Sequence, residues 1–367
     1  EMDAQWKTQK LSRAGADPVE PLYTVEDTQA ALELLRPCEY RQDVPLFDGV
    51  QATFIDAGHL LGSASILVTA RESGLTRTIA FSGDIGNTDQ PIIRDPDYIT
   101  QADYVVMEST YGNRLHEAGG YTVEELAQTF DKTLSRGGNV VIPSFAVGRT
   151  QELLYYIREM KGQRMVRSMP DFPVYVDSPL ALEATEIYSG DLRGYADEDT
   201  ILVPRKGFEP IRFPNLHLCR SSDESKLLNM DKAPKVIISS SGMCEAGRIR
   251  HHLKHNLWRP ECTILFVGYQ ANGTLGRLLV DGIDAVKLFG EKISVKADVV
   301  NFRGMSGHAD KAGLTRWIGA FAPEKPRKVF VVHGEEEAAL TFAETIRLMG
   351  FDPLVPDFRA VYDLAAD

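Results

Sequence analysis

The stretch FIDAGHLLGSASILV, residues 54–68, places a histidine between two predicted β-strands. Phe54 to Asp56 predicts the end of one strand and Ile66 to Val68 the start of the next, with His59 in a turn of small residues between them. Small residues let the backbone pack closely around another group, and a neutral imidazole is the commonest metal ligand in proteins. His59 is therefore either a metal ligand or a hydrogen-bonded polar residue in a tight turn.

The rest of the chain alternates short β-branched runs with amphipathic segments, which predicts an α/β protein. Strands are predicted at residues 77–81, 103–108, 139–145, 173–178, 235–241, 263–270 and 328–334. Helices are predicted at residues 122–136, 149–161, 309–321 and 335–349, and the first opens with a capping box formed by Thr122 and Glu125. Residues 189–233 are rich in charge, proline and glycine, which predicts loops on an edge.

Length and composition limit the possible classes of protein. The 367 residues are enough for two domains. The net charge of −12 argues mildly against nonspecific binding to polyanions, although it allows a local basic cleft. No apolar run approaches the roughly 20 residues of a membrane span, and the four cysteines show no paired spacing. We expect a cytoplasmic protein without a membrane partner.

Ionisable residues follow four of the predicted strands. His59 follows FIDAG, Asp84 ends IAFSGD, Glu108 ends VVME and His333 ends VFVVH, while His308 comes just before a predicted helix. Each residue alone has an ordinary explanation, such as an Asx-turn, a loop cap or a buried histidine. Together they predict a metal or acid–base site on one rim of a sheet.

Three strand–loop–helix junctions carry small residues and an arginine: residues 144–150 (SFAVGRT), 239–248 (SSSGMCEAGR) and 268–277 (GYQANGTLGR). Backbone N–H groups at such helix starts bind anions, although ordinary turn chemistry remains the alternative for each. The residues predicted to contact phosphate or RNA are Ser144, Arg149, Ser239, Ser240, Ser241, Gly242, Arg248 and Arg277. Arg205, Lys206 and Arg212 would extend this surface, whereas the basic stretch at 248–258 predicts a solvated helix face.

Eight motifs in this order resemble one known family: DAGHLLGSAS, FSGDIG, MESTYGNR, PSFAVGRTQELLYYI, SSSGMCEAGR, GYQANGTLGR, GMSGHAD and VVHGE. They resemble the β-CASP branch of the metallo-β-lactamase fold, and most of all the group with the cleavage-and-polyadenylation endonuclease subunit and its prokaryotic RNA-processing relatives. The resemblance implies a partial αββα metallo-β-lactamase sandwich at residues 1–112 and 304–367. A Rossmann-like α/β β-CASP domain would be inserted at 113–303.

The resemblance also implies residue roles. His59, Asp84 and His333 would be metal ligands, and Asp84 would take part in catalysis by bridging two zinc ions. Glu108 would orient His308, and His308 would protonate the leaving oxygen. Phosphodiester hydrolysis needs a nucleophile at neutral pH and compensation for charge on the leaving oxygen, which zinc with His and Asp ligands can supply.

One family motif is absent from the chain. The pattern His-x-His-x-Asp-His, which carries the family's main zinc ligands, occurs nowhere among the eight histidines. We therefore expect this chain to be an incomplete portion of an enzyme, inactive by itself, with the missing N-terminal segment as a partner.

The predicted function is zinc-dependent hydrolysis of RNA, most simply single-stranded RNA, in RNA processing or decay. A small-molecule hydrolase of the same fold, such as a thioesterase or lactonase, is one alternative, and the large arginine-bearing insert argues against it. A catalytically inactive RNA-binding scaffold is another, and the five filled motif positions argue against that. The sequence leaves open endonuclease or exonuclease action and the oligomeric state, a homodimer included.

Overall fold

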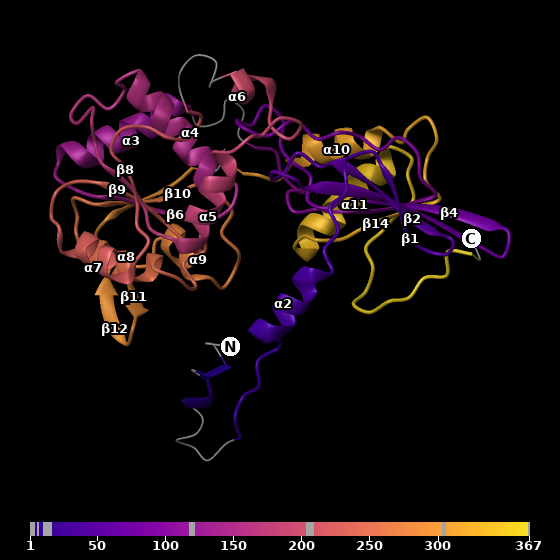
Figure 1. Ribbon diagram of the computed structural model, residues 1–367, viewed down its shortest axis with the longest axis horizontal. Coiled ribbons are helices and arrows are strands. Elements are labelled where there is room, and N and C mark those ends of the chain that lie inside the picture. Colours follow the sequence, from indigo (N-terminus) through magenta and orange to yellow (C-terminus); the bar gives the residue numbers. More distant parts are fainter. Residues whose placement is uncertain are drawn as a thin grey trace.

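The structure is a computed structural model that describes residues 4–5, 7–9, 17–116, 122–202, 209–302 and 306–365. The chain forms two lobes, each built around its own β-sheet (Figure 1). Helices cover both sheets, so the predicted α/β fold class is confirmed.

The first lobe is built on a seven-stranded sheet with the order β1-β2-β3-β4-β5-β14-β15. Its strands are β1 (Asp43–Phe47), β2 (Val50–Asp56), β3 (Ala64–Glu72), β4 (Leu75–Phe81), β5 (Tyr104–Met107), β14 (Lys328–Val331) and β15 (Pro353–Leu354). Strands β1 to β4 pair antiparallel, whereas β4, β5, β14 and β15 pair parallel. Helices α10 (Lys311–Gly319) and α11 (Glu336–Leu348) bury Trp317, Ile318, Phe342 and Ile346 in this lobe's core.

In the sequence, the second lobe is inserted between β5 and β14, which are neighbouring strands of the first sheet. The chain leaves after β5 and returns at β14, which pairs in parallel with β5 (Lys328 opposite Tyr104). Between them lies a six-stranded, wholly parallel sheet with the order β13-β10-β6-β9-β7-β8. Its strands are β6 (Val140–Pro143), β7 (Val174–Val176), β8 (Leu216–Leu218), β9 (Val236–Ser239), β10 (Thr263–Phe266) and β13 (Asp298–Asn301).

Helices cover both faces of the six-stranded sheet, as a parallel sheet requires. Neighbouring side chains on β6 point to opposite faces: Ile142 packs in one core with α3 to α5, and Val141 packs in another with α8 and α9. The remaining elements are α2 (Val25–Glu33), α3 (Val123–Ser135), α4 (Arg149–Gly162), α5 (Pro179–Tyr188), α6 (Glu198–Leu202), α7 (Ser222–Met230), α8 (Ile249–Asn256), α9 (Leu275–Val280), β11 (Ala285–Leu288) and β12 (Glu291–Ser294).

The predicted elements agree with the structure except in one region. All seven predicted strands and all four predicted helices are present within a few residues, and the capping box of Thr122 and Glu125 is formed. The prediction of loops at residues 189–233 is wrong in part, because α6, β8 and α7 lie there. Helix α7 has a capping box of its own, in which Ser221 and Glu224 satisfy the first-turn N–H groups.

The predicted domain boundaries at 112/113 and 303/304 stay a prediction. Within the described part of the chain, no helix combines the length and the apolar character needed to cross a membrane.

Candidate metal and acid–base site

The strands of the seven-stranded sheet bring four of the predicted site residues to one edge. Strands β4, β5 and β14 run parallel, and β2 runs in the same direction because two antiparallel pairings separate it from β4. The carboxyl ends of these four strands therefore meet at the same edge. His59, Asp84, Glu108 and His333 follow those ends within three residues.

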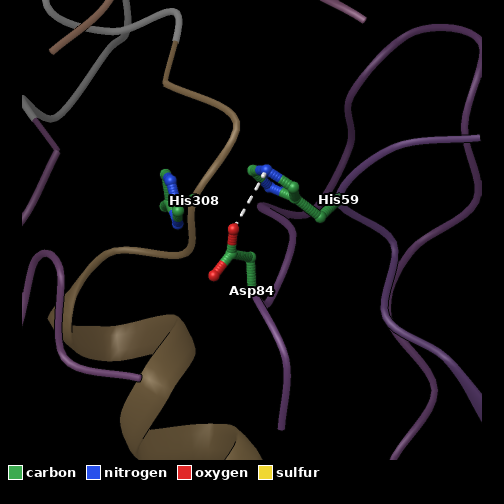
Figure 2. Close-up of side chains that lie close together, drawn as sticks. All are labelled: His59, Asp84 and His308. Atoms are coloured by element: carbon green, nitrogen blue, oxygen red, sulfur yellow. Dashed lines mark ion pairs between the residues drawn. The ribbon is translucent and has the colours of Figure 1, made fainter. Parts of the chain in front are cut away.

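Asp84 lies between two histidines. Its Oδ2 atom is 3.9 Å from Nε2 of His59, and its Oδ1 atom is 3.4 Å from Nδ1 of His333. Figure 2 shows the Asp84 carboxylate beside the rings of His59 and His308. Each carboxylate oxygen of Asp84 thus has a different imidazole beside it.

His59 is mostly buried and its ring orientation is held by the backbone. Its Nδ1 atom lies 3.1 Å from the carbonyl oxygen of Gly307, which leaves Nε2 facing Asp84. Burial and the neighbouring His308 lower the pKa of His59, which favours the neutral ring that binds metals.

The buried Glu108 pairs with the partly buried His308. The Nδ1 atom of His308 lies 3.2 Å from both carboxylate oxygens of Glu108, which also accepts a 2.6 Å hydrogen bond from the Ile85 N–H. Burial alone would raise the pKa of Glu108, but bonds from His308, Thr110 and Ile85 outweigh burial and lower it. Burial would lower the pKa of His308, but Glu108 outweighs burial and raises it.

Close backbone packing holds the site loops together. Gly86 pairs with His308 in a β-bridge, and its N–H donates to the Ala57 carbonyl at 2.8 Å. A Cβ atom on Gly86 would lie 1.7 Å from the carbonyl oxygen of Gly58, so only glycine fits there. The small residues around His59 thus allow two site loops to pack against each other.

The donor set fits a metal ion of the zinc type. His59, Asp84 and His333 offer imidazole nitrogens and a carboxylate, the donors that zinc accepts. His308 is also near, since one ligand atom each from His59, Asp84 and His308 lies within 4.8 Å of the others. The Nδ1 atom of His308 is occupied by Glu108, so His308 can offer only Nε2.

The residues predicted to contact phosphate lie in different surroundings. The Arg149 side chain is largely buried in an ion pair with Glu152, beside Gly307 of the site loop. Ser144 is buried, and its hydroxyl bonds to Thr150 and to the Phe145 carbonyl.

At the second junction, residues 239–248, most of the predicted contact residues bond to other groups of the protein. Arg248 donates to Asp177 at 2.7 Å and to two backbone carbonyls, and the Ser239 hydroxyl donates to the Asp177 carbonyl at 2.7 Å. Ser241 forms a long bond within its own turn, and Gly242 lies against the Phe145 ring. The buried Ser240 hydroxyl, however, has no hydrogen-bond partner within the described residues.

Arg277, at the third junction, is partly exposed and paired with Asp281 one helical turn further on, at 2.9 Å. Arg212 pairs with Glu186 and Glu209. Arg205 and Lys206 lie outside the described residues, as do Gly304 and Met305 of the motif GMSGHAD. A phosphate-binding role for the three junctions remains a prediction.

Sequence reasoning missed several residues around the site. A ring nitrogen of His116 lies 3.0 Å from the carbonyl oxygen of His308, and the His116 N–H donates to Asp310. Tyr111 is buried with its ring 6.4 Å from that of His308. No spacing rule singles out these positions, because they follow Glu108 in an irregular loop and meet His308 only in the folded chain.

A sheet edge that brings two histidines and a carboxylate together, beside a second carboxylate–histidine pair, is typical of metallo-hydrolases, and comparison with known proteins agrees. The Beta-Casp domain matches residues 150–279, and the Zn-dependent metallo-hydrolase RNA specificity domain matches residues 292–356. The chain is 39% identical to a ribonuclease from Thermus thermophilus over 90% of this chain and 73% of that protein. It is 33% identical to an RNase J-like protein from Methanocaldococcus jannaschii, over 88% of this chain and 73% of that protein.

More distant relatives include the transcription termination factor FttA of Pyrococcus abyssi, 29% identical over 92% of this chain and 52% of that protein. The chain belongs to the β-CASP family of metallo-β-lactamase-fold nucleases. The family predicted from the eight motifs is therefore confirmed.

Proposed function

We infer that the chain carries the acid–base pair, part of the metal shell and the RNA-contacting lobe of a zinc-dependent ribonuclease that acts in RNA processing or decay. The observation that carries this proposal is the Asp84 carboxylate between His59 and His333, beside the pair of Glu108 and His308. The match to an RNA specificity domain and the relative named a ribonuclease support RNA as the substrate. They favour it over a small-molecule substrate.

His59, Asp84 and His333 would hold zinc, with Asp84 shared between two ions. Zinc, when bound, lowers the pKa of water and stabilises charge on phosphate oxygens, which supplies a nucleophile near neutral pH. Three protein ligands cannot complete two tetrahedral shells, even with Asp84 shared. We propose that further ligands come from a segment with the pattern His-x-His-x-Asp-His, in the same chain or in another.

His308 would donate a proton to the leaving oxygen of the cleaved phosphodiester. Its Nδ1 atom is held by Glu108, so the Nε2 atom is the one available to substrate. A leaving alkoxide is a strong base, and protonating it as the bond breaks lowers the barrier. Glu108 acts by keeping the His308 ring oriented and favouring its charged form.

RNA would lie along the small-residue junctions of the second lobe. The partly exposed guanidinium of Arg277 supports phosphate contacts there. An acidic protein can bind RNA in this way, because positive potential is needed only where the backbone of the nucleic acid runs.

The test combines zinc content with cleavage. The chain is loaded with zinc, dialysed and analysed for metal, then mixed with a peptide or domain carrying His-x-His-x-Asp-His and with single-stranded RNA. We expect zinc to be held weakly by the chain alone, to rise on mixing, and RNA to be cut only in the mixture. Hydrolysis of a thioester or lactone by the mixture, with RNA left intact, would overturn the proposal.

A further inference from the structure

A cavity of about 470 Å³ opens directly beside the acid–base pair. His59 and His308 are among the residues that line it, so the cavity is continuous with the candidate site. Both lobes contribute walls: Leu60 and Pro91 come from the first, and Phe145, Val147, Leu180 and Met243 from the second. Its volume lies within the range of pockets that bind small organic groups, roughly 300–1,000 Å³.

The walls of this cavity are mainly apolar, and part of the apolar surface is open to solvent. Phe145 is 48% exposed, Val147 40% and Leu180 61%. Apolar side chains left open around a ligand-sized cavity mark a binding site more often than chance exposure.

The Phe145 ring has a fixed position. A Cβ atom on Gly242 would lie 3.1 Å from the ring, so the ring packs against the bare backbone of that glycine. Phe145 belongs to the turn between β6 and α4, whose backbone is tied down by the Thr150 hydroxyl bonding to the Phe145 carbonyl at 2.7 Å. A ring held from one side and exposed on the other offers a flat face to a ligand.

The polar groups of the cavity do not suit a phosphate. Arg149 is the arginine that lines the cavity, and its guanidinium already pairs with the buried Glu152. Glu152 also lines the cavity, so a phosphate bound there would lie beside a carboxyl group. A phosphate pushed against Phe145, Val147 and Leu180 would lose water without gaining hydrogen bonds.

We propose that this cavity takes the nucleobase of a nucleotide next to the cleaved phosphate, stacked on the exposed face of Phe145. The inference rests on the proposed ribonuclease function and adds a second kind of contact to it, base stacking beside phosphate binding. Every nucleobase has an apolar face and polar edges, so it fits a mainly apolar cavity that continues into a phosphodiester-cleaving site. Stacking on an aromatic ring tolerates any base sequence.

The test compares RNA with and without a base. Fluorescein-labelled single-stranded RNA and a series of the same RNA with one abasic position each are titrated into the wild-type chain, Phe145→Ala and Phe145→Tyr. One abasic position should weaken binding to the wild type, and Phe145→Ala should weaken binding of intact RNA by about 5- to 150-fold. The loss of affinity from the abasic position and the loss from Phe145→Ala should not add, because both remove the same stacking contact. Phe145→Tyr should bind intact RNA nearly as tightly as the wild type.

Phe289→Ala is the matched control, because Phe289 is 49% exposed and lies in the turn between β11 and β12. It should bind RNA like the wild type. The salt dependence of binding should be the same for wild type and Phe145→Ala, since no phosphate contact is lost.

The outcomes separate this inference from the proposed function. The stacking site is overturned if no abasic position changes the affinity of the wild type for RNA. It is also overturned if an abasic position weakens binding to Phe145→Ala as much as it weakens binding to the wild type. Either result leaves the ribonuclease proposal in place. Binding of a free apolar compound or of a second copy of the chain, blocked by Phe145→Ala while RNA affinity is unchanged, also overturns the stacking site. Absence of RNA binding by the wild type overturns both.

Discussion

The Nδ1 atom of His308 lies 3.2 Å from each carboxylate oxygen of Glu108, although the two residues are 200 positions apart in the chain. Glu108 is 1% exposed, so its charge is shielded from water and is held by His308 and by two backbone N–H groups. An imidazole with one nitrogen fixed in this way presents its other nitrogen in a single orientation, as a proton donor requires.

His308→Ala should lower RNA cleavage by roughly 10²- to 10⁴-fold in the preparation that cleaves, because the leaving oxygen loses its proton donor. Zinc content, measured by elemental analysis, should stay at the wild-type level. Since an atom of His308 lies within 4.8 Å of ligand atoms of His59 and Asp84, the opposite result is a real alternative. Loss of zinc from His308→Ala would make this histidine a ligand.

Replacing Arg277 tests the predicted phosphate-binding junctions most directly, because its side chain is 41% exposed and forms an ion pair with the exposed Asp281. If Arg277 contacts one phosphate, Arg277→Gln should reduce the slope of log K against log salt by about 0.7 for single-stranded RNA. Arg193→Gln is the control, since Arg193, like Arg277, is paired with an aspartate close to it in sequence, Asp191. If both variants have the same slope of log K against log salt, Arg277 does not contact a phosphate and only pairs with Asp281 on the helix surface.

The location of the site could be predicted from sequence because strand ends are local features. His59, Asp84, Glu108 and His333 each follow a β-branched run, and parallel strands bring such positions to one edge. The reason for the small residues around His59 could not be predicted. Gly58 packs against Gly86, a contact between two loops that no local pattern records.

The role of Arg248 also depends on contacts distant in sequence. It was predicted as a phosphate contact from the local pattern Gly-Arg at a helix start, yet its guanidinium donates to Asp177, 71 positions away. Asp177 in turn bonds to His252 and Ser225 at 2.7 and 2.5 Å. A pattern of residue types shows that a cation is present, but only the fold shows which anion it faces.

Asp177→Asn should destabilise the second lobe. Burial would raise the pKa of Asp177, but hydrogen bonds from His252, Ser225 and Arg248 outweigh burial and lower it below its usual 3.8. The ionised carboxylate therefore stabilises the fold above about pH 4, and this contribution is lost as pH falls through the lowered pKa. At pH 7 the free energy of unfolding should fall by roughly 3–5 kcal/mol, because Arg248 loses a buried partner.

Denaturant unfolding of wild type and Asp177→Asn at several pH values measures this difference. This difference should shrink only as pH falls from about 4 through the lowered pKa of Asp177, where the wild-type carboxylate becomes protonated as well. Asp191→Asn, which removes an exposed partner of Arg193, should leave stability close to that of the wild type. A difference between Asp177→Asn and wild type that is constant with pH would show that the charge of Asp177 contributes nothing.

Gly86→Ala should disrupt the site through the backbone. The added Cβ atom would lie 1.7 Å from the Gly58 carbonyl oxygen, so the two loops would have to separate. We expect a loss of roughly 3 kcal/mol or more in the free energy of unfolding, together with weaker zinc binding. Gly162→Ala, where nothing lies within 4 Å, should be neutral or stabilising by up to about 1 kcal/mol. Similar effects of both variants on zinc would argue against close packing as the cause.

Asp84→Asn should abolish zinc binding more completely than either histidine variant. Each oxygen of Asp84 faces a different imidazole, so removing its charge affects both halves of the ligand set, whereas His59→Ala or His333→Ala affects one. Zinc affinity of the chain is measured by competition with a chromogenic chelator at fixed pH, with Asp48→Asn in the exposed turn between β1 and β2 as the control. The expected order of affinity is wild type equal to Asp48→Asn, then the two histidine variants, then Asp84→Asn. If His333→Ala binds zinc as well as the wild type while His308→Ala does not, the ligand set is His59, Asp84 and His308, and the acid–base role of His308 falls with it.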